Sequence, residues 1–168
     1  EEAYVQFCFS EVYGSQAENF ILRWSGNVDT EPQVATAVDG NLMSEIDRVL
    51  VNSKVVCRSI QPNFMRAYNL LGKYADQSFW FVFVELGELV IGYFPKGVCQ
   101  SIRKIRVASK WKAVLPDLLQ REFNAFEMDK NEQNILICIP EHMELRSLKL
   151  DGWNVGLFNF DQMQLLEG

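Results

Sequence analysis

The residues with the clearest chemical potential lie at one bend between two apolar runs. Glu85, Gly87 and Glu88 belong to the stretch FWFVFVELGELVIGYFPKG, Phe79 to Gly97, which predicts two hydrophobic strands joined at the glycine. A glycine at such a bend lets the backbone approach a ligand, and its N–H groups can hold a phosphate. The flanking carboxylates oppose this chemistry, because like charges about 4 Å apart repel by ~4 kcal/mol at an effective dielectric constant near 20.

Carboxylates suggest a second chemistry, metal binding. Glu85, Glu88, Asp39 and Asp151 are the candidates for a nuclease site, in which acidic residues hold two Mg²⁺ ions for attack on a phosphodiester. The chain has no Asp-x-Asp pair, and its formal net charge of -6 disfavours a nucleic-acid partner. Exposed strand ends and turns explain these carboxylates better, so a metal-dependent nuclease is kept as an alternative.

Other catalytic arrangements have no support in the sequence. His142 is the only histidine, and one histidine with four scattered cysteines has no zinc-site spacing. Patterns such as G-x-S-x-G, Walker A and G-x-G-x-x-G are missing from the sequence. We therefore expect no enzymatic activity.

The elements that must position the bend follow an α/β order. Hydrophobic spacing predicts a helix at 41–51, with Asp39 or Asn41 as its N-cap, and a helix from Pro62 to Gly72. The other elements predicted before residue 75 are a strand at 3–9, a strand or short helix at 18–24, and strands at 33–38 and 54–60.

The second part of the chain is richer in strands. The strand at 79–84 is apolar on both faces, which predicts a central strand covered by helices on both sides. A hairpin is expected at 143–160 with its turn at Asp151-Gly152. The remaining elements are strands at 89–94, 98–107 and 134–140 and a helix at 110–126. We predict two subdomains, 1–75 and 76–168, in an α/β fold with mixed sheets and flanking helices.

Composition narrows the class of protein. The chain is 48% hydrophobic and 23% charged, as expected for a globular fold, and it has no apolar run of about 18 residues, so direct membrane insertion of this chain is not expected. The four cysteines each adjoin hydrophobic runs, which predicts buried thiols in a reducing compartment. We expect a cytoplasmic protein.

Several short stretches between about residues 33 and 126 carry a family resemblance. They are VATAV before a helix, SIQP before NFMRAYNLL, the strand pair VELG…GYF…G, and the basic strand SIRKI. In this order they resemble the actin-like ATPase (ribonuclease H-like) superfamily, and within it the PilM and GspL group of type IV pilus and type II secretion proteins. The resemblance implies a partial or degenerate actin-like architecture, ATP bound between two subdomains, and inner-membrane assembly proteins as partners.

This sequence departs from the pattern that the resemblance implies. The phosphate loop of the family has an Asp, a Gly two positions on and a Thr four further, where this chain has Glu85, Gly87 and Ile91. The Gly-Gly turn beside the adenosine is matched by Gly152 followed by Trp153, whose bulk would block close approach. If a nucleotide cleft is retained, Glu85, Gly87, Glu88 and Gly152 line it, with ATP and Mg²⁺ as ligands.

The departures lead to one hypothesis. We expect a relative without nucleotide or other cofactor that binds other proteins, as a scaffold in a pilus or secretion apparatus at the periphery of the inner membrane. Trp111 and Trp153, which lie beside charged or turn residues, are the candidate partner-binding residues. An ATP-binding actin-like protein and a free-standing adaptor domain remain alternatives, as does the nuclease.

Overall fold

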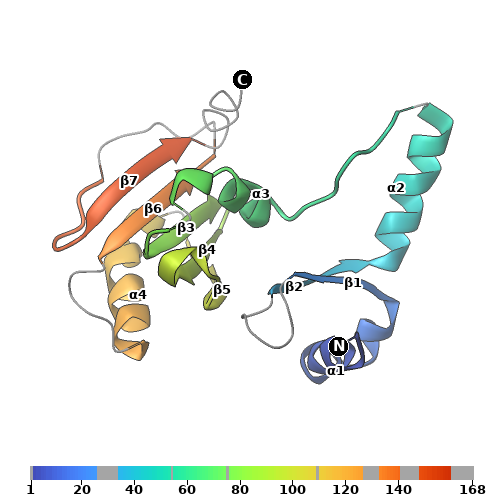
Figure 1. The fold of residues 1–168 in the computed structure, drawn as a ribbon, viewed down its shortest axis with the longest axis horizontal. Coiled ribbons are helices and arrows are strands. Elements are labelled where there is room, and N and C mark those ends of the chain that lie inside the picture. The colour runs from blue at the N-terminus through green and yellow to red at the C-terminus, as the bar shows by residue number, and fades with distance from the viewer. Residues whose placement is uncertain are drawn as a thin grey trace. The chain divides into compact units, whose positions relative to one another are not determined.

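A computed structural model describes residues 2–25, 34–53, 55–74, 76–108, 110–126, 133–140 and 148–159. Figure 1 shows the path of the chain and its labelled elements. The chain forms two compact units, Glu1–Ile60 and Gln61–Gly168. The division predicted after residue 75 lies beyond this boundary, and the segment between them contains helix α3 (Asn63–Asn69), which packs on the sheet of the second unit.

The first unit combines a two-stranded antiparallel sheet with two helices. Asp39 Oδ1 accepts hydrogen bonds from the N–H groups of Asn41 (2.7 Å) and Leu42 (3.2 Å), so Asp39 caps the second helix, as one of the two predicted caps. The elements in order are α1 (Glu2–Tyr13), the 3-10 turn η1 (Gly14–Asn19), β1 (Phe20–Ser25), β2 (Val34–Asp39) and α2 (Gly40–Ser53).

Two predictions for the first unit are wrong. Residues 3–9 lie in α1 and not in a strand, because Val5, Phe9 and Val12 also recur at helical spacing and seven residues cannot separate the two periods. Residues 55–60 form no strand and are exposed, since no described strand offers their backbone a partner. Residues 18–24, for which a strand and a short helix were both considered, form the end of the 3-10 turn η1 followed by strand β1.

The second unit is built on a mixed five-stranded sheet with the order β5-β4-β3-β6-β7. Strands β3, β4 and β5 are antiparallel neighbours, while β6 runs parallel to β3 and β7 parallel to β6. Besides α3, its elements are η2 (Gly72–Tyr74), β3 (Phe79–Glu85), β4 (Glu88–Phe94), η3 (Pro95–Gly97), β5 (Ser101–Arg106), α4 (Trp111–Ala125), β6 (Asn134–Ile139) and β7 (Asn154–Asn159).

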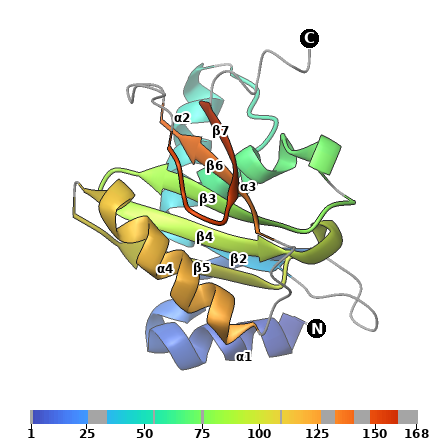
Figure 2. The ribbon, with the colours of Figure 1, turned by 90° about the vertical axis from the view of Figure 1, so that its left-hand side faces the viewer.

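Apolar side chains cover both faces of the central strand β3, as predicted. Trp80, Val82 and Val84 pack in one cluster with the apolar stripe of α4, which Figure 2 shows lying across the strands. Alternate residues of β3 point to the opposite face. There Phe79, Phe81 and Phe83 pack with side chains of α3.

The predicted hairpin at 143–160 is wrong for its described part. Residues 148–150 form no strand, and β7 pairs in parallel with β6. Asp151 and Gly152 do form a turn, in which the N–H of Trp153 donates to the carbonyl of Leu150 at 3.0 Å. Residues 143–147 lie outside the described residues.

The cysteines also differ from prediction, because Cys8 and Cys57 are exposed and only Cys138 is fully buried among the four free thiols. Both exposed thiols lie in the first unit, which buries few side chains. No helix in the described ranges has the length and apolarity that a bilayer span requires.

Candidate functional site

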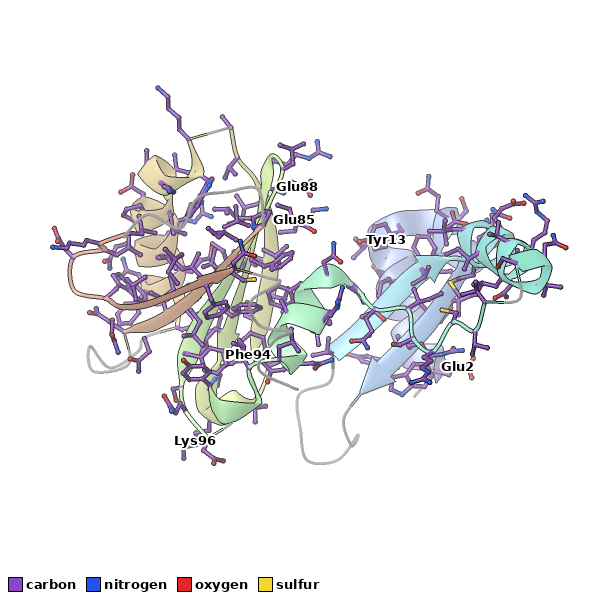
Figure 3. The ribbon with its side chains drawn as sticks, turned by 90° about the horizontal axis from the view of Figure 1, so that it is seen from above. Glu2, Tyr13, Glu85, Glu88, Phe94 and Lys96 are labelled. Carbon is purple, nitrogen blue, oxygen red and sulfur yellow. The ribbon has the colours of Figure 1, made fainter. Side chains whose placement is uncertain are left out.

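The candidate phosphate loop is the tight turn between β3 and β4, which we call the hairpin end (Glu85, Leu86, Gly87 and Glu88). Glu85 and Glu88 are register partners across the two strands. Gly87 has φ +77°, a conformation that side chains with a Cβ rarely adopt, which explains the glycine. Figure 3 shows both carboxylates at this end of the hairpin, with Phe94 and Lys96 at the other end.

Ion pairs hold the carboxylate of Glu88. Lys104 Nζ lies 2.6 Å from Glu88 Oε2, and Arg106 Nε lies 3.9 Å from Glu88 Oε1. The hydrogen bond to Glu88 and its negative charge raise the pKa of the Lys104 ammonium, so the lysine stays charged. Glu85 Oε1 accepts a weak hydrogen bond from Asn63 Nδ2 at 3.4 Å. The repulsion of a phosphate expected from Glu88 is therefore partly offset.

The hairpin end lacks the side-chain hydrogen-bond donors of a phosphate site. None of its side chains donates a hydrogen bond, because ionised Glu is an acceptor and Leu and Gly have no polar side-chain atom. Ile91, which stands where the family has its Thr, is 2% exposed and packs in the cluster beneath α4. The missing hydroxyl position is thus inside the core, out of reach of a ligand.

Gly152 lies at the opposite end of the sheet from Gly87. In the parallel register, Phe83 pairs with Cys138 and Cys138 with Phe158, so β3, β6 and β7 begin at one end and finish at the other. Gly87 follows the last residue of β3, whereas Gly152 precedes the first residue of β7. A strand length of roughly 20 Å separates the two ends, at about 3.3 Å per residue. The two glycines, which were expected to line one cleft only if a nucleotide site is retained, thus lie at opposite ends of this sheet.

Trp153 fills the core next to this turn. Its ring packs edge-on against Phe123 (centroids 5.8 Å apart) and Trp80 (6.5 Å). The indole therefore contributes to the contact between β3 and α4. Gly152 has φ +82°, which the turn before β7 requires.

Trp111 is not an exposed partner-binding residue, contrary to prediction. It is 6% exposed and packs with Leu115 and Leu119, which follow it at helical spacing on α4. That i, i+4, i+8 spacing was readable from the sequence and indicates a core position. Trp153, the other tryptophan predicted to bind a partner, is half-buried.

A small pocket that the sequence did not predict lies at the end of the sheet where β3, β6 and β7 begin. Its volume is about 180 Å³, and its lining includes Tyr74, Gln77, Asn134 and Asn154. Asn154 Nδ2 donates to Asn134 Oδ1 at 3.0 Å, so the two amides largely satisfy each other. The only sequence signal is an Asn at the start of both β6 and β7.

The metal-site alternative gains no support from the geometry. Across the described ranges, no three His, Cys, Asp or Glu side chains are grouped so that they could hold a metal ion. Asp39 caps α2 in the first unit, and Asp151 is exposed at the far end of the sheet from Glu85. His142 lies outside the described residues.

Comparison with known proteins identifies the fold. No protein-family model matches the sequence, and a search of curated proteins by sequence finds no match. Among solved structures, a chain of the PilM-PilN type IV pilus biogenesis complex matches with a TM-score of 0.67 at 12% identity, over 96% of this chain and 62% of that chain. A protein of unknown function with an actin-like ATPase fold from Bacteroides thetaiotaomicron matches with a TM-score of 0.58 at 12% identity, over 99% and 66% of the two chains.

These matches confirm the predicted fold class. The chain is a mixed α/β protein whose fold resembles that of actin-like ATPases and of the PilM structure. It spans less than two thirds of the length of the PilM-PilN match, and thus corresponds to part of that architecture.

Proposed function

We propose that this chain is a noncatalytic assembly component of a type IV pilus or type II secretion apparatus, which binds protein partners at the cytoplasmic face of the inner membrane without a nucleotide. The observation that carries this proposal is the hairpin end. On a fold shared with actin-like ATPases, the turn in the place of a phosphate loop has no donor side chain, and its Glu88 is bound to Lys104.

Two further observations support a role in protein binding. The matching PilM chain belongs to a complex with a second protein, PilN. In the first unit, large apolar side chains such as Tyr4, Phe7, Val51 and Val56 are exposed. Aromatic side chains such as Tyr4 and Phe7 are enriched at protein–protein interfaces, so a protein partner is the ligand class we favour.

The proposal is tested by capture of the partner. The tagged full chain is cross-linked in cells of its source, and the inner-membrane fraction is solubilised and analysed by mass spectrometry, with the tag alone as control. We expect one inner-membrane assembly protein to be enriched equally with Mg-ATP and after removal of nucleotide. Enrichment that requires ATP would support the ATP-binding alternative, and the absence of any assembly protein would contradict the proposed role.

A further inference from the structure

The edge of the sheet at β5 offers unpaired backbone groups. Val107 N–H donates to the carbonyl of Gly87 at 2.9 Å, which identifies these two as a hydrogen-bonded pair of the β4–β5 ladder. Hydrogen-bonded and non-bonded pairs alternate in an antiparallel ladder. The backbone N–H and C=O groups of Ile102, Lys104 and Arg106 therefore point away from β4. No strand in the described part of the chain pairs with this edge.

Cations dominate this edge. Arg103, Lys104 and Arg106 are three of the six residues of β5, and none of the six is acidic. Their side chains are largely exposed, and Arg106 is 94% exposed. The opposite edge of the same sheet, β7, contains no charged residue. The positive charge is therefore a property of one edge and not of the sheet as a whole.

Carboxylates on the neighbouring elements orient these cations without neutralising all of them. The buried Glu122 of α4 lies 3.3 Å from Arg103 and 3.3 Å from Arg121, and Glu88 lies beside Lys104 and Arg106. Each carboxylate thus serves two cations. The charge of Glu85 also acts on Lys104, so three carboxylates face the four cations Arg103, Lys104, Arg106 and Arg121, and one positive charge remains for an incoming anionic group.

We propose that the β5 edge binds an extended acidic segment of a protein partner, which adds to the sheet as a sixth strand. This inference rests on the proposed function in that the partner is a protein. The partner segment carries acidic residues at alternate positions, facing Lys104 and Arg106, since side chains of adjacent strands on one face lie opposite each other. Ile102, on the same face, supplies an apolar contact.

A second copy of this chain is a poor occupant. Pairing of β5 with β5 in an antiparallel dimer brings the three cations of one copy close to those of the other, and like charges across a ladder are destabilising. Charged edge strands also disfavour edge-to-edge self-association. An acidic strand neutralises this positive charge. Charge complementarity is therefore the reason to favour an acidic segment of a protein partner.

The probe for a direct test is a fluorescent eight-residue peptide of alternating Glu and Val, titrated into the full chain and followed by anisotropy. We expect binding that weakens as salt is raised, because screening acts on exposed ion pairs. A peptide of alternating Lys and Val is expected not to bind.

Two matched pairs of variants separate the contribution of backbone hydrogen bonds to peptide binding from that of charge. Ile102→Pro removes an outward N–H without touching the ladder to β4, whereas Ile102→Ala removes the same side chain and keeps the N–H. Arg106→Glu reverses one edge charge, and Lys149→Glu makes the same change at an exposed residue next to the far end of the sheet. We expect roughly tenfold weaker peptide binding for Ile102→Pro and Arg106→Glu and less than about threefold for their partners, with far-UV circular dichroism unchanged.

Several results would overturn the inference. They are equal binding by Ile102→Pro and the wild type, binding of the lysine peptide, or a wild-type dimer in sedimentation that Ile102→Pro abolishes. Binding of anionic phosphatidylserine vesicles with no effect of Ile102→Pro on any ligand would assign the charge to lipid instead.

If Arg106→Glu still captures the inner-membrane assembly protein at full yield, the edge is not the docking site although the proposed function stands. Peptide binding without capture of any assembly protein would support the edge and contradict the proposed function.

Discussion

The two compact units differ in how much apolar surface they bury. In the second unit, every residue from Phe79 to Val84 of β3 is buried, with α4 packed on one face and α3 on the other. In the first unit, the buried apolar residues among those described are Val5, Ala17 and Leu22, and α2 buries none of its side chains fully. The second unit is therefore stabilised by its core, and the first by local interactions such as the cap of α2.

This difference bears on function as well as stability. A unit of about 60 residues is marginal even with a good core, so the first unit gains stability whenever another surface covers its apolar side chains. The second unit has a rigid sheet whose charged edge and hairpin end keep their geometry without such help. Four measurements test this difference between the two units.

The largest expected effect is on the core of the second unit. Phe81 is fully buried and its ring centroid lies 5.1 Å from that of Phe64. We expect Phe81→Ala to lower the free energy of unfolding by about 3–5 kcal/mol, measured by urea denaturation with near-UV circular dichroism. Leu22→Ala in the first unit should leave this transition in place. A loss below about 1 kcal/mol for Phe81→Ala would show that the sheet is not a cooperative core.

A smaller loss of stability is expected at Gly92, where the absence of a side chain leaves space for aromatic rings. A Cβ at Gly92 would lie 2.6 Å from Phe94 Cε2 and 3.0 Å from Phe64 Cζ, so Gly92→Ala displaces both rings. We expect a loss of about 1–3 kcal/mol in the free energy of unfolding. Gly72→Ala is the control, because a Cβ there meets no atom within 4 Å. Equal stability of the two variants would contradict the packing of Phe64 on the sheet.

In the first unit the expected effect is local. Asp39→Ala removes the side chain that accepts the hydrogen bonds of Asn41 and Leu42, which costs a helix about 1 kcal/mol. Because α2 has no fully buried residue, we expect faster amide hydrogen exchange along α2 and an unchanged second unit. Asp47→Ala, at an exposed position of the same helix, is the control. Similar exchange in both variants would mean that packing and not the cap stabilises α2.

The smallest expected effect is a pH dependence of the free energy of unfolding of the second unit. Burial raises the pKa of the Cys99 thiol above its ordinary value of 9.0 and that of the Tyr68 phenol above 10.0, and the phenol donates to the carbonyl of Gly97. The folded protein keeps these protons to higher pH than the unfolded chain. Stability is therefore complete below the ordinary pKa of the thiol and is lost as pH rises through the folded values.

Urea unfolding from neutral pH to about 10 measures this decline. Cys99→Ala should delay its onset, while Cys57→Ala, at an exposed thiol of the first unit, should not. An identical alkaline decline in the wild type and Cys99→Ala would mean that the thiol contributes nothing to it.

Local patterns in the sequence predicted the elements of the second unit well. The run from Phe79 to Val84 is apolar throughout, Gly87 marks the hairpin turn, and both features belong to neighbouring residues. The cap at Asp39 was likewise visible, because a cap and its helix are adjacent in sequence. The helix α1 was not predicted, because a short apolar segment without turn signals fits both the helical and the strand periodicity.

The candidate site was less predictable because it depends on strand order. Gly87 and Gly152 were expected to share a cleft if a nucleotide site is retained, but the parallel placement of β7 beside β6 sends them to opposite ends of the sheet. The pairing of Glu88 with Lys104 depends on the register of β4 and β5, which no local motif encodes. The charged neighbours of Trp111 indicate exposure, whereas its helical spacing with Leu115 and Leu119 indicates the core position that the structure shows.

We propose that the hairpin end has lost phosphate binding. Calorimetric titration of the full chain with ATP and Mg²⁺ tests this proposal. We predict no saturable heat up to about 1 mM nucleotide, corresponding to a binding free energy weaker than about 4 kcal/mol. A saturable transition with micromolar affinity, reduced by substitution of Gly87 by Val, would contradict the account and make this chain a nucleotide-binding protein.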